Sequence, residues 1–177
     1  MGASFFAGNT CDVARSLIGA ILRVGSCAGA IVEVEAYRAD AASHAVTRPR
    51  QGAMLKDTYG RIYVYLIYGM HHCLNITTER EGVGAVLIRA VEPLEGLTQM
   101  RLRRGCDKLL NLTNGPGKLC QAFGIDRSYH GEMVGQRLSI HPPQRPFPVS
   151  QGPRIGIRKA TELPWRYFVP GNRFVSR

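Results

Sequence analysis

The stretch IYVYLIYGMHHCLNITT, residues 62–78, decides the fold that we expect. Residues 62–68 are aromatic and aliphatic side chains of the kind that favour a β-strand, and residues 71–78 continue this pattern after Gly69-Met70, which is typical of a turn. Strands joined by so short a turn run antiparallel, because a parallel pair needs a long crossover connection. The stretch therefore predicts an antiparallel hairpin.

The flanking segments extend this hairpin into a protein of strands and helices. We predict further strands over residues 29–37 (GAIVEVEAY) and 85–91 (AVLIRAV). The sequence lacks an alternating strand–helix–strand pattern, so the predicted class is α+β, as a single domain over residues 1–177. The other predicted elements are helices over 11–22 (N-cap Thr10), 92–103 and 115–123, a polar loop over 38–60, and short strands over 154–157 and 167–169.

A net charge of +10 on 177 residues predicts a polyanionic partner. Residues 1–100 carry 9 basic and 9 acidic side chains, whereas residues 101–177 carry 14 basic and 4 acidic ones, so the excess lies in the second part. Of the 23 basic residues 19 are Arg, whose planar guanidinium binds phosphate through two hydrogen bonds. Nucleic acid is the expected partner, and a basic but otherwise inert surface is the alternative.

Several protein classes are excluded. No run of 18 apolar residues is present, and the N-terminal MGASFF lacks the basic start of a secretory signal. The five cysteines are far apart and form no CxxC pair, which indicates reduced thiols in an intracellular protein. HExxH is missing, and the adjacent His71 and His72 point to opposite faces of a strand. We therefore expect no membrane segment, no metal and no cofactor.

Alternation along residues 29–37 places Glu33, Glu35 and Tyr37 on one strand face. A carboxylate beside an aromatic ring suits a general base, whereas two solvated surface glutamates are the alternative. Arg89 lies inside the apolar run VLIRAV, where a buried guanidinium must find a partner. Arg89 could pair with Glu35, either as a structural ion pair or around a bound water.

Four tyrosines, Tyr59, Tyr63, Tyr65 and Tyr68, fall within ten residues. Tyr63 and Tyr65 share a strand face and could form a platform on which a base stacks. Tyr68 and Met70 flank the expected hairpin tip, where a bulky aromatic and a flexible apolar side chain resemble a wedge between bases. The alternative is a strand that is rich in aromatics because such residues suit strands.

Two further polar features stand out. Asn75 lies inside the apolar strand CLNIT, where a buried amide needs hydrogen-bond partners. Gly115-Pro116-Gly117-Lys118 opens a predicted helix, whose free N–H groups and lysine could hold a phosphate; plain helix capping is the alternative.

Five blocks of this sequence resemble the alkyladenine (3-methyladenine) DNA glycosylases. They occur in order over nearly the whole chain, and the third is highly specific. The resemblance implies one mixed domain with a curved, open-barrel-like antiparallel sheet surrounded by helices. It also implies that the partner is double-stranded DNA containing damaged purines. The blocks are IVEVEAY (31–37), DAASHA (40–45), YVYLIYGMHHCLN (63–75), VLIRAVEPLEGL (86–97) and GPGKLCQAFGI (115–125).

The resemblance also implies residue roles. Glu35 would activate a water that attacks the deoxyribose C1′ of a flipped-out nucleotide, and Arg89 would help to position that water. The residues that would contact the base are Tyr37, His44 and Tyr65, which sandwich it, and Asn75, which helps to refuse an unmodified guanine amino group. No lysine lies among these matched pocket residues, so the resemblance implies a monofunctional enzyme that leaves an abasic site.

Further residues are expected to contact the duplex. Tyr68 would enter the gap that the base leaves, with Met70 nearby. The cations expected on the DNA backbone are Arg50, Lys118, Arg101, Arg103 and Arg104. The loop over residues 45–51 is two or three residues shorter than is usual in the family, and Gln51 stands where Asn is usual, which leaves the lesion range open.

The predicted function is therefore excision of 3-methyladenine and hypoxanthine, with ethenoadenine as a further candidate, by a monomeric DNA glycosylase. A nucleic-acid binder that only stacks bases on its tyrosines remains an alternative, which predicts no preference for lesions. A hydrolase of free nucleosides that uses the same carboxylate is the third hypothesis.

Overall fold

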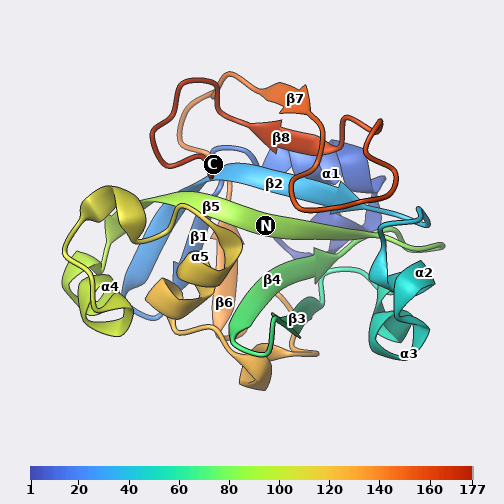
Figure 1. Cartoon of the computed structure of the whole chain (residues 1–177), viewed down its shortest axis with the longest axis horizontal. Helices are drawn as coiled ribbons and strands as arrows, with labels where there is room; N and C mark the ends of the chain where they lie inside the picture. Colours follow the sequence, from blue (N-terminus) through green and yellow to red (C-terminus); the bar gives the residue numbers. More distant parts are fainter. Residues whose placement is uncertain (177) are drawn as a thin grey trace.

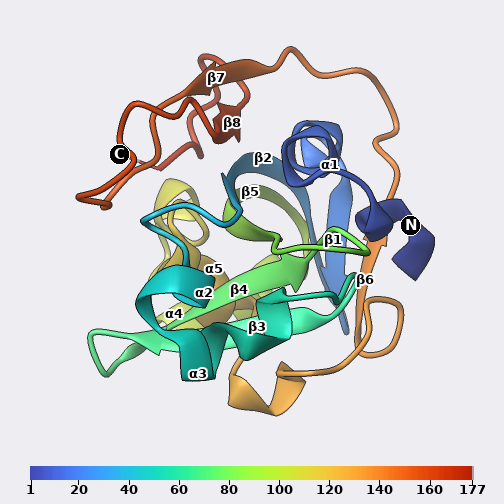
Figure 2. The same ribbon diagram turned by 90° about the vertical axis from the view of Figure 1, so that its right-hand side faces the viewer.

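The structure is a computed structural model that describes residues 1–176. Its centre is an antiparallel sheet that curves without closing (Figures 1 and 2). Within residues 1–176 the strand order is β3-β4-β5-β2-β1-β6, with β8 beside β2 and β7 beside β8. The predicted α+β class is confirmed. The strands are β1 (Ile21–Val24), β2 (Cys27–Tyr37), β3 (Ile62–Ile67), β4 (His71–Thr77), β5 (Ala85–Glu95), β6 (Leu138–His141), β7 (Ser150–Gly152) and β8 (Arg166–Phe168).

The central strand β2 determines where charged side chains meet. β5 pairs along one edge of β2, while β1 and β8 share the opposite edge. Glu33 pairs with Ala90 and Val34 with Ile88, so Arg89 is the extra residue of a β-bulge in β5. A bulge redirects the side chain of the extra residue. Here it turns Arg89 toward Glu33 and Glu35 on the neighbouring strand.

The first helix is shorter than the sequence predicts. α1 spans Thr10–Leu17, and its N-cap is Asn9, whose side chain accepts a hydrogen bond from the Cys11 N–H, rather than Thr10. Gly19 has a φ of +83°, which ends the helical path, and residues 21–24 become β1. Leu22 and Val24, alternate residues of β1, are buried as expected for a strand. The predicted helix over 11–22 wrongly included the first two residues of this strand.

The second predicted helix also begins later. β5 runs through Pro93 to Glu95, and α4 (Leu97–Arg104) starts only after Gly96, whose φ is +76°. Within residues 1–176, β4 pairs only with residues 85–87 of β5, so β5 is an edge strand at Pro93, a position in a sheet where proline is tolerated. The third predicted helix is confirmed as α5 (Pro116–Phe123), which packs on β4, β5 and α4.

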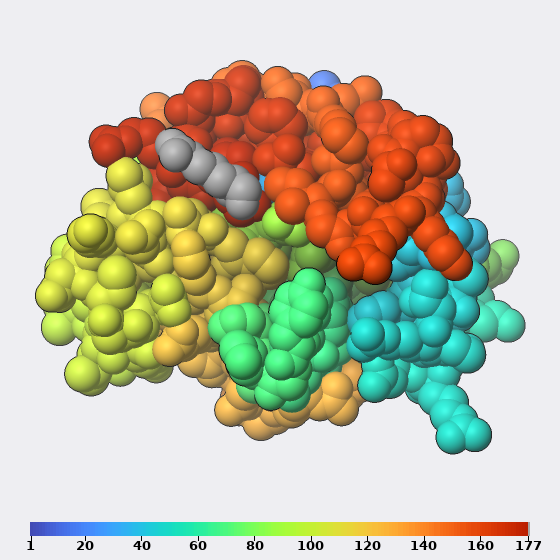
Figure 3. Space-filling view, viewed as in Figure 1, coloured from blue at the N-terminus to red at the C-terminus, as the bar shows by residue number. Residues whose placement is uncertain are grey.

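The segments between the predicted elements are more structured than expected. Residues 38–60, predicted as a polar loop, contain α2 (His44–Thr47), α3 (Pro49–Gly52) and a 3₁₀ turn over Ala53–Leu55. Residues 154–157, predicted as a strand, are irregular, and the short strand lies earlier at β7. Figure 3 shows the tip of the β3–β4 hairpin (green) between α4–α5 (yellow), the C-terminal segment (orange and red) and α2–α3 (cyan).

Candidate active site

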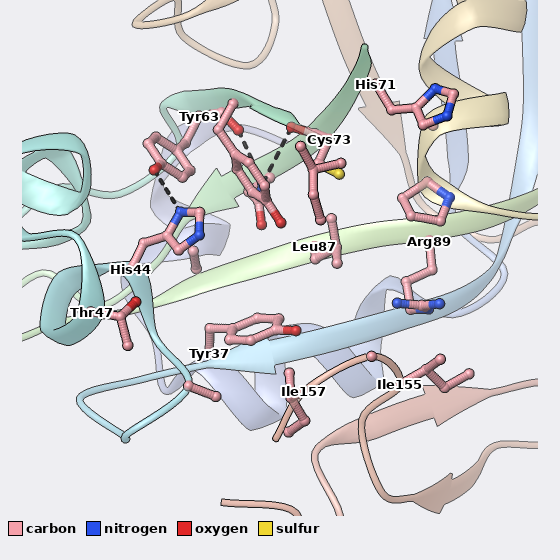
Figure 4. A pocket seen from close by; sticks show the side chains of 18 of the residues that line it. Tyr37, His44, Thr47, Tyr63, His71, Cys73, Leu87, Arg89, Ile155 and Ile157 are labelled. Carbon is pink, nitrogen blue, oxygen red and sulfur yellow. Dashed lines mark hydrogen bonds between the residues drawn. The ribbon is translucent and has the colours of Figure 1, made fainter. Parts of the chain in front are cut away.

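A cavity of about 770 Å³ lies between these segments, a volume typical of small-molecule sites. Its walls come from the end of β2, α2, the β3–β4 hairpin, β5, the start of α5 and residues 155–159. Figure 4 shows Tyr37 pointing into this cavity from β2, opposite His44 and Tyr63. The three side chains therefore surround one space although they come from three separate elements.

Glu35 lies directly behind the cavity wall. Its side chain is 0% exposed, which excludes the solvated strand face that was the alternative. Oε1 accepts the Ile155 N–H at 2.7 Å and lies 3.2 Å from Nη1 of Arg89, and Oε2 accepts the Tyr37 hydroxyl at 2.8 Å. These three partners of Glu35 line the cavity. Oε2 has the fewer donors, so it is the oxygen that keeps a lone pair for another proton.

Arg89 links Glu35 to a second buried carboxylate. Its Nε donates to Glu33 Oε1 at 3.2 Å, and its Nη2 donates to Ser176 Oγ at 3.1 Å. Glu33 also accepts Arg166 Nε at 2.6 Å, so two carboxylates and two guanidinium groups balance their charges in this cluster. Burial lowers the pKa of Arg89, but the charges of Glu35 and Glu33 outweigh burial and hold that pKa above its ordinary value.

The aromatic side chains form the opposite wall. The ring centroids of His44 and Tyr65 are 4.4 Å apart, those of Tyr63 and Tyr65 5.7 Å, and His44 Nδ1 lies 2.9 Å from the Tyr63 hydroxyl. Burial, with a contribution from Arg48, lowers the pKa of His44, so the imidazole is neutral at pH 7. Burial likewise raises the pKa of Tyr37, as does the Glu35 charge, and keeps its hydroxyl a donor.

Backbone contacts fix two of the predicted base-binding residues. Asn75 is 4% exposed, and its Nδ2 lies 3.2 Å from the Tyr63 carbonyl and 3.4 Å from that of Cys73, which fixes the amide in the cavity wall. His44 begins α2, and a Cβ on Gly52 would meet the His44 carbonyl at 2.5 Å. Glycine at position 52 thus lets α3 approach α2 closely enough to hold His44.

The hairpin tip is exposed, as the sequence predicts. Tyr68 is 81% and Met70 70% exposed, and Tyr68 also lines the cavity. The backbone is left-handed at both Tyr68 (φ 54°) and Gly69 (φ 70°). A non-glycine residue in this region costs about 1–3 kcal/mol, so the turn holds the tyrosine outward against local strain.

The predicted DNA-binding cations differ in whether they line the cavity. Lys118, whose Nζ lies 2.9 Å from Asn114 Oδ1, and Arg104 line the cavity. Arg103 donates to the Ala122 carbonyl at 3.1 Å, near the C-terminus of α5, where a cation stabilises the helix. Arg50 and Arg101 lie outside the cavity wall. Three cations that the sequence analysis did not select also line the cavity: Arg48, Arg158 and Lys159.

The residues that sequence reasoning missed come mainly from the C-terminal segment. Ile155 contacts Glu35 across 120 positions of sequence, and Arg154 forms an ion pair with Asp40. No local pattern signals such a distant contact. Glu33 was visible in the alternation of β2, but its place beside Arg89 follows from the bulge. Within residues 1–176, no group of three His, Cys, Asp or Glu side chains could hold a metal ion, and no helix could cross a membrane.

Comparison with known proteins identifies the family. A family model described as methylpurine-DNA glycosylase matches residues 4–173. This chain belongs to the methylpurine-DNA glycosylase family. The predicted enzyme class, a DNA glycosylase of DNA repair, is thereby confirmed.

Similar members of the family occur in bacteria and archaea. A protein of Agrobacterium fabrum is 48% identical over 182 residues, covering 98% of this chain and 91% of its own length. One of Nitrosospira multiformis is 46% identical, with 97% and 91% covered, and one of Methanoculleus marisnigri is 44% identical, with 99% and 97% covered. All three are assigned as 3-methyladenine DNA glycosylases.

Proposed function

We propose that this methylpurine-DNA glycosylase is a monomeric, intracellular, monofunctional 3-methyladenine DNA glycosylase that excises a flipped-out purine and leaves an abasic site. The observation that carries the proposal is Glu35, a buried carboxylate held by three partners directly behind an aromatic cavity. A water between this carboxylate and a deoxyribose C1′ is the reactant that the arrangement suits.

Access to the reaction requires base flipping, because the glycosidic carbon of a stacked base cannot be reached. The cavity of about 770 Å³ has room for a purine nucleotide, and cations around it attract the phosphates beside the extruded residue. Tyr68 and Met70 project at the tip of the hairpin beside the cavity. Their insertion into the duplex offsets part of the unstacking cost of a few kcal/mol.

The aromatic walls favour a cationic base. A purine alkylated at N3 carries positive charge, and cation–π attraction to Tyr37 and Tyr65 contributes about 1–2 kcal/mol in a desolvated site. Burial lowers the pKa of His44 and keeps its ring neutral, so the third aromatic group does not repel the charge. The positive charge also makes the base a better leaving group.

Glu35 has two roles in the proposed step. Its carboxylate accepts a proton from the water at Oε2 as the water oxygen bonds to C1′, and the C1′–N bond breaks with its electron pair going to the purine. Its negative charge stabilises the oxocarbenium-like transition state. A cationic base departs as a neutral molecule, whereas a neutral lesion such as hypoxanthine also needs a proton on the leaving base.

Two lysines line the cavity, and their surroundings differ from those of a nucleophilic lysine. Such a lysine is desolvated so that its amine loses its proton. Lys159 is exposed, and Nζ of the half-buried Lys118 is bound to Asn114. We therefore propose hydrolysis without a Schiff base. Borohydride should trap no covalent complex with abasic DNA, and a trapped complex would contradict the monofunctional assignment.

The deciding experiment incubates the enzyme with duplex DNA containing 3-methyladenine, hypoxanthine or ethenoadenine and measures the free base. We expect 3-methyladenine release from the wild type. Binding to undamaged and abasic-site duplexes with equal affinity and no base release would favour the base-stacking binder. Hydrolysis of free nucleosides with none of DNA would favour the nucleoside hydrolase.

A further inference from the structure

Arg154 is a buried arginine that lies outside the cavity wall. Its side chain is 0% exposed, and Nη2 and Nη1 donate to the two carboxylate oxygens of Asp40 at 2.8 and 3.1 Å. Nη1 also donates to the Ala36 carbonyl at 3.1 Å, and Nη2 to the Ala160 carbonyl at 3.4 Å. One guanidinium thus joins the end of β2, the segment that follows it and residues 154–160.

The same guanidinium also packs on aromatic rings. Its central carbon lies 4.6 Å from the ring centroid of Tyr37 and 5.2 Å from that of Trp165. Tyr37 lines the cavity and Arg154 does not, so the arginine contacts the tyrosine ring without itself lining the cavity. The arginine therefore restrains Tyr37 from outside the cavity.

Stability alone does not account for a charge at this position. Burying a guanidinium is costly, and well-packed apolar side chains often stabilise a core as well as a buried ion pair does. Here the Arg154 Nε has no hydrogen-bond partner within residues 1–176, which adds to the cost. What the guanidinium supplies and an apolar side chain cannot supply is several directed contacts at once.

Arg154 is connected to two of the three groups that hold Glu35, one through the peptide chain and one through its guanidinium. The residue after Arg154, Ile155, donates its N–H to Oε1, and Tyr37, under the guanidinium, donates its hydroxyl to Oε2. The third group, Arg89, is held separately by Glu33 and Ser176. Removing Arg154 should therefore release two partners of Glu35 and leave the third in place.

We propose that Arg154 is a positioning residue of the glycosylase reaction: paired with Asp40, it holds the Ile155 N–H and the Tyr37 hydroxyl on the two oxygens of Glu35. The proposal rests on the function proposed above and assigns Arg154 no contact with substrate. The other charged or titratable groups around Glu35 are Arg89 on β5, Cys73 on β4, Glu33 on β2 and Arg166 on β8. None of these has a hydrogen bond or ion pair with Arg154 in the structure of residues 1–176.

The test measures the single-turnover rate constant of 3-methyladenine release with enzyme in excess. A variant that only folds less well keeps the rate constant while its folded fraction remains in excess and saturating, whereas a misplaced Glu35 lowers the rate constant itself. We expect Arg154→Met to lower the rate constant about 10- to 100-fold, because a misplacement of about 1 Å at reacting groups costs on the order of 100-fold. Affinity for an abasic-site duplex should stay within about twofold of wild type.

Two conservative variants keep the test decisive if Arg154→Met does not fold. Arg154→Lys keeps the charge but not the paired contacts, so its rate constant should lie between those of the wild type and Arg154→Met. Asp40→Asn should lower the rate constant as well, without further loss when combined with Arg154→Lys. The control is Arg137→Met, which removes a comparable ion pair with Glu132 and a ring contact with Tyr129 on the exposed surface.

The outcomes separate this proposal from the one on which it rests. Base release by the wild type, with Arg154→Lys and Asp40→Asn as fast as Arg137→Met, overturns the positioning role and leaves the proposed function intact. An equal loss of rate and of abasic-site affinity also overturns it, because Arg154 would then support the cavity as a whole. No base release by the wild type refutes the proposed function itself.

Discussion

The proposed mechanism depends most directly on Glu35, and the substitution Glu35→Gln tests it with the least change in shape. Oε1 faces two donors, the Ile155 N–H and Arg89, while Oε2 faces the Tyr37 hydroxyl. The amide oxygen of glutamine should therefore occupy the Oε1 position and its NH₂ group the Oε2 position. Tyr37 can rotate its hydroxyl to accept from that NH₂, so the cluster stays hydrogen-bonded.

The two effects of this substitution differ in size. A hydrogen bond to a charged group contributes about 1.5–3 kcal/mol, and Arg89 keeps Glu33 as a partner, so the loss of stability should stay near that range. The loss of activity should be larger, because the position that accepted the water proton now donates one. General-base catalysis contributes about 10²–10⁴-fold, which corresponds to roughly 3–5 kcal/mol of barrier.

The assay is single-turnover release of 3-methyladenine from a duplex, followed by chromatography of the free base, with urea unfolding of each variant in parallel. The matched control is Glu79→Gln, which removes a half-buried carboxylate paired with Arg38 at 2.7 Å outside the cavity. The control should lose stability but not rate. A Glu35→Gln variant that releases base at the wild-type rate would refute the assignment of Glu35 as the base.

Four further substitutions test the geometry. Tyr68→Ala should slow excision from duplex DNA about tenfold or more, from the roughly 1–3 kcal/mol of a lost base-stacking contact, and should affect an unpaired lesion less, which a comparison of paired and single-stranded substrates checks. Arg101→Gln should weaken binding to damaged and undamaged duplexes equally and reduce the salt dependence of binding by about one phosphate contact; a loss of affinity confined to damaged DNA would contradict the placement of Arg101 on the DNA backbone. Arg103→Gln should instead lower the thermal stability, because the Arg103 side chain holds the C-terminal end of α5. Because the pKa of His44 is lowered in the folded protein, the unfolded chain binds a proton at this residue more readily. The free energy of unfolding should therefore decrease as the pH falls below the ordinary histidine pKa of 6.5. Urea unfolding of His44→Gln at several pH values should show a weaker decrease than that of the wild type.

The strands were predictable because their signals are local. The hairpin over residues 62–78 and the strands over 29–37 and 85–91 are observed within a few residues of their predicted limits, since alternation and a tight turn act over short distances. The predicted helix and strand limits were wrong where pairing with a neighbouring strand decided the local structure. Ile18 and Ile21 fit the period of α1, but Ile21 pairs with Ala30 in a strand. Pro93 stays in β5 because β5 is an edge strand at that position.

The sequence by itself determined the residue types of the candidate site: the carboxylate of Glu35, the aromatic set and the exposed Tyr68 lie in strands or at a hairpin tip that local patterns place. Only the tertiary structure decided how that chemistry is arranged. The bulge at Arg89, the contact of Ile155 with Glu35 and that of Arg154 with Ala36 join strands and loops up to 120 residues apart. Such contacts depend on complementary packing and on satisfying buried charges across the whole fold, which short-range patterns do not encode.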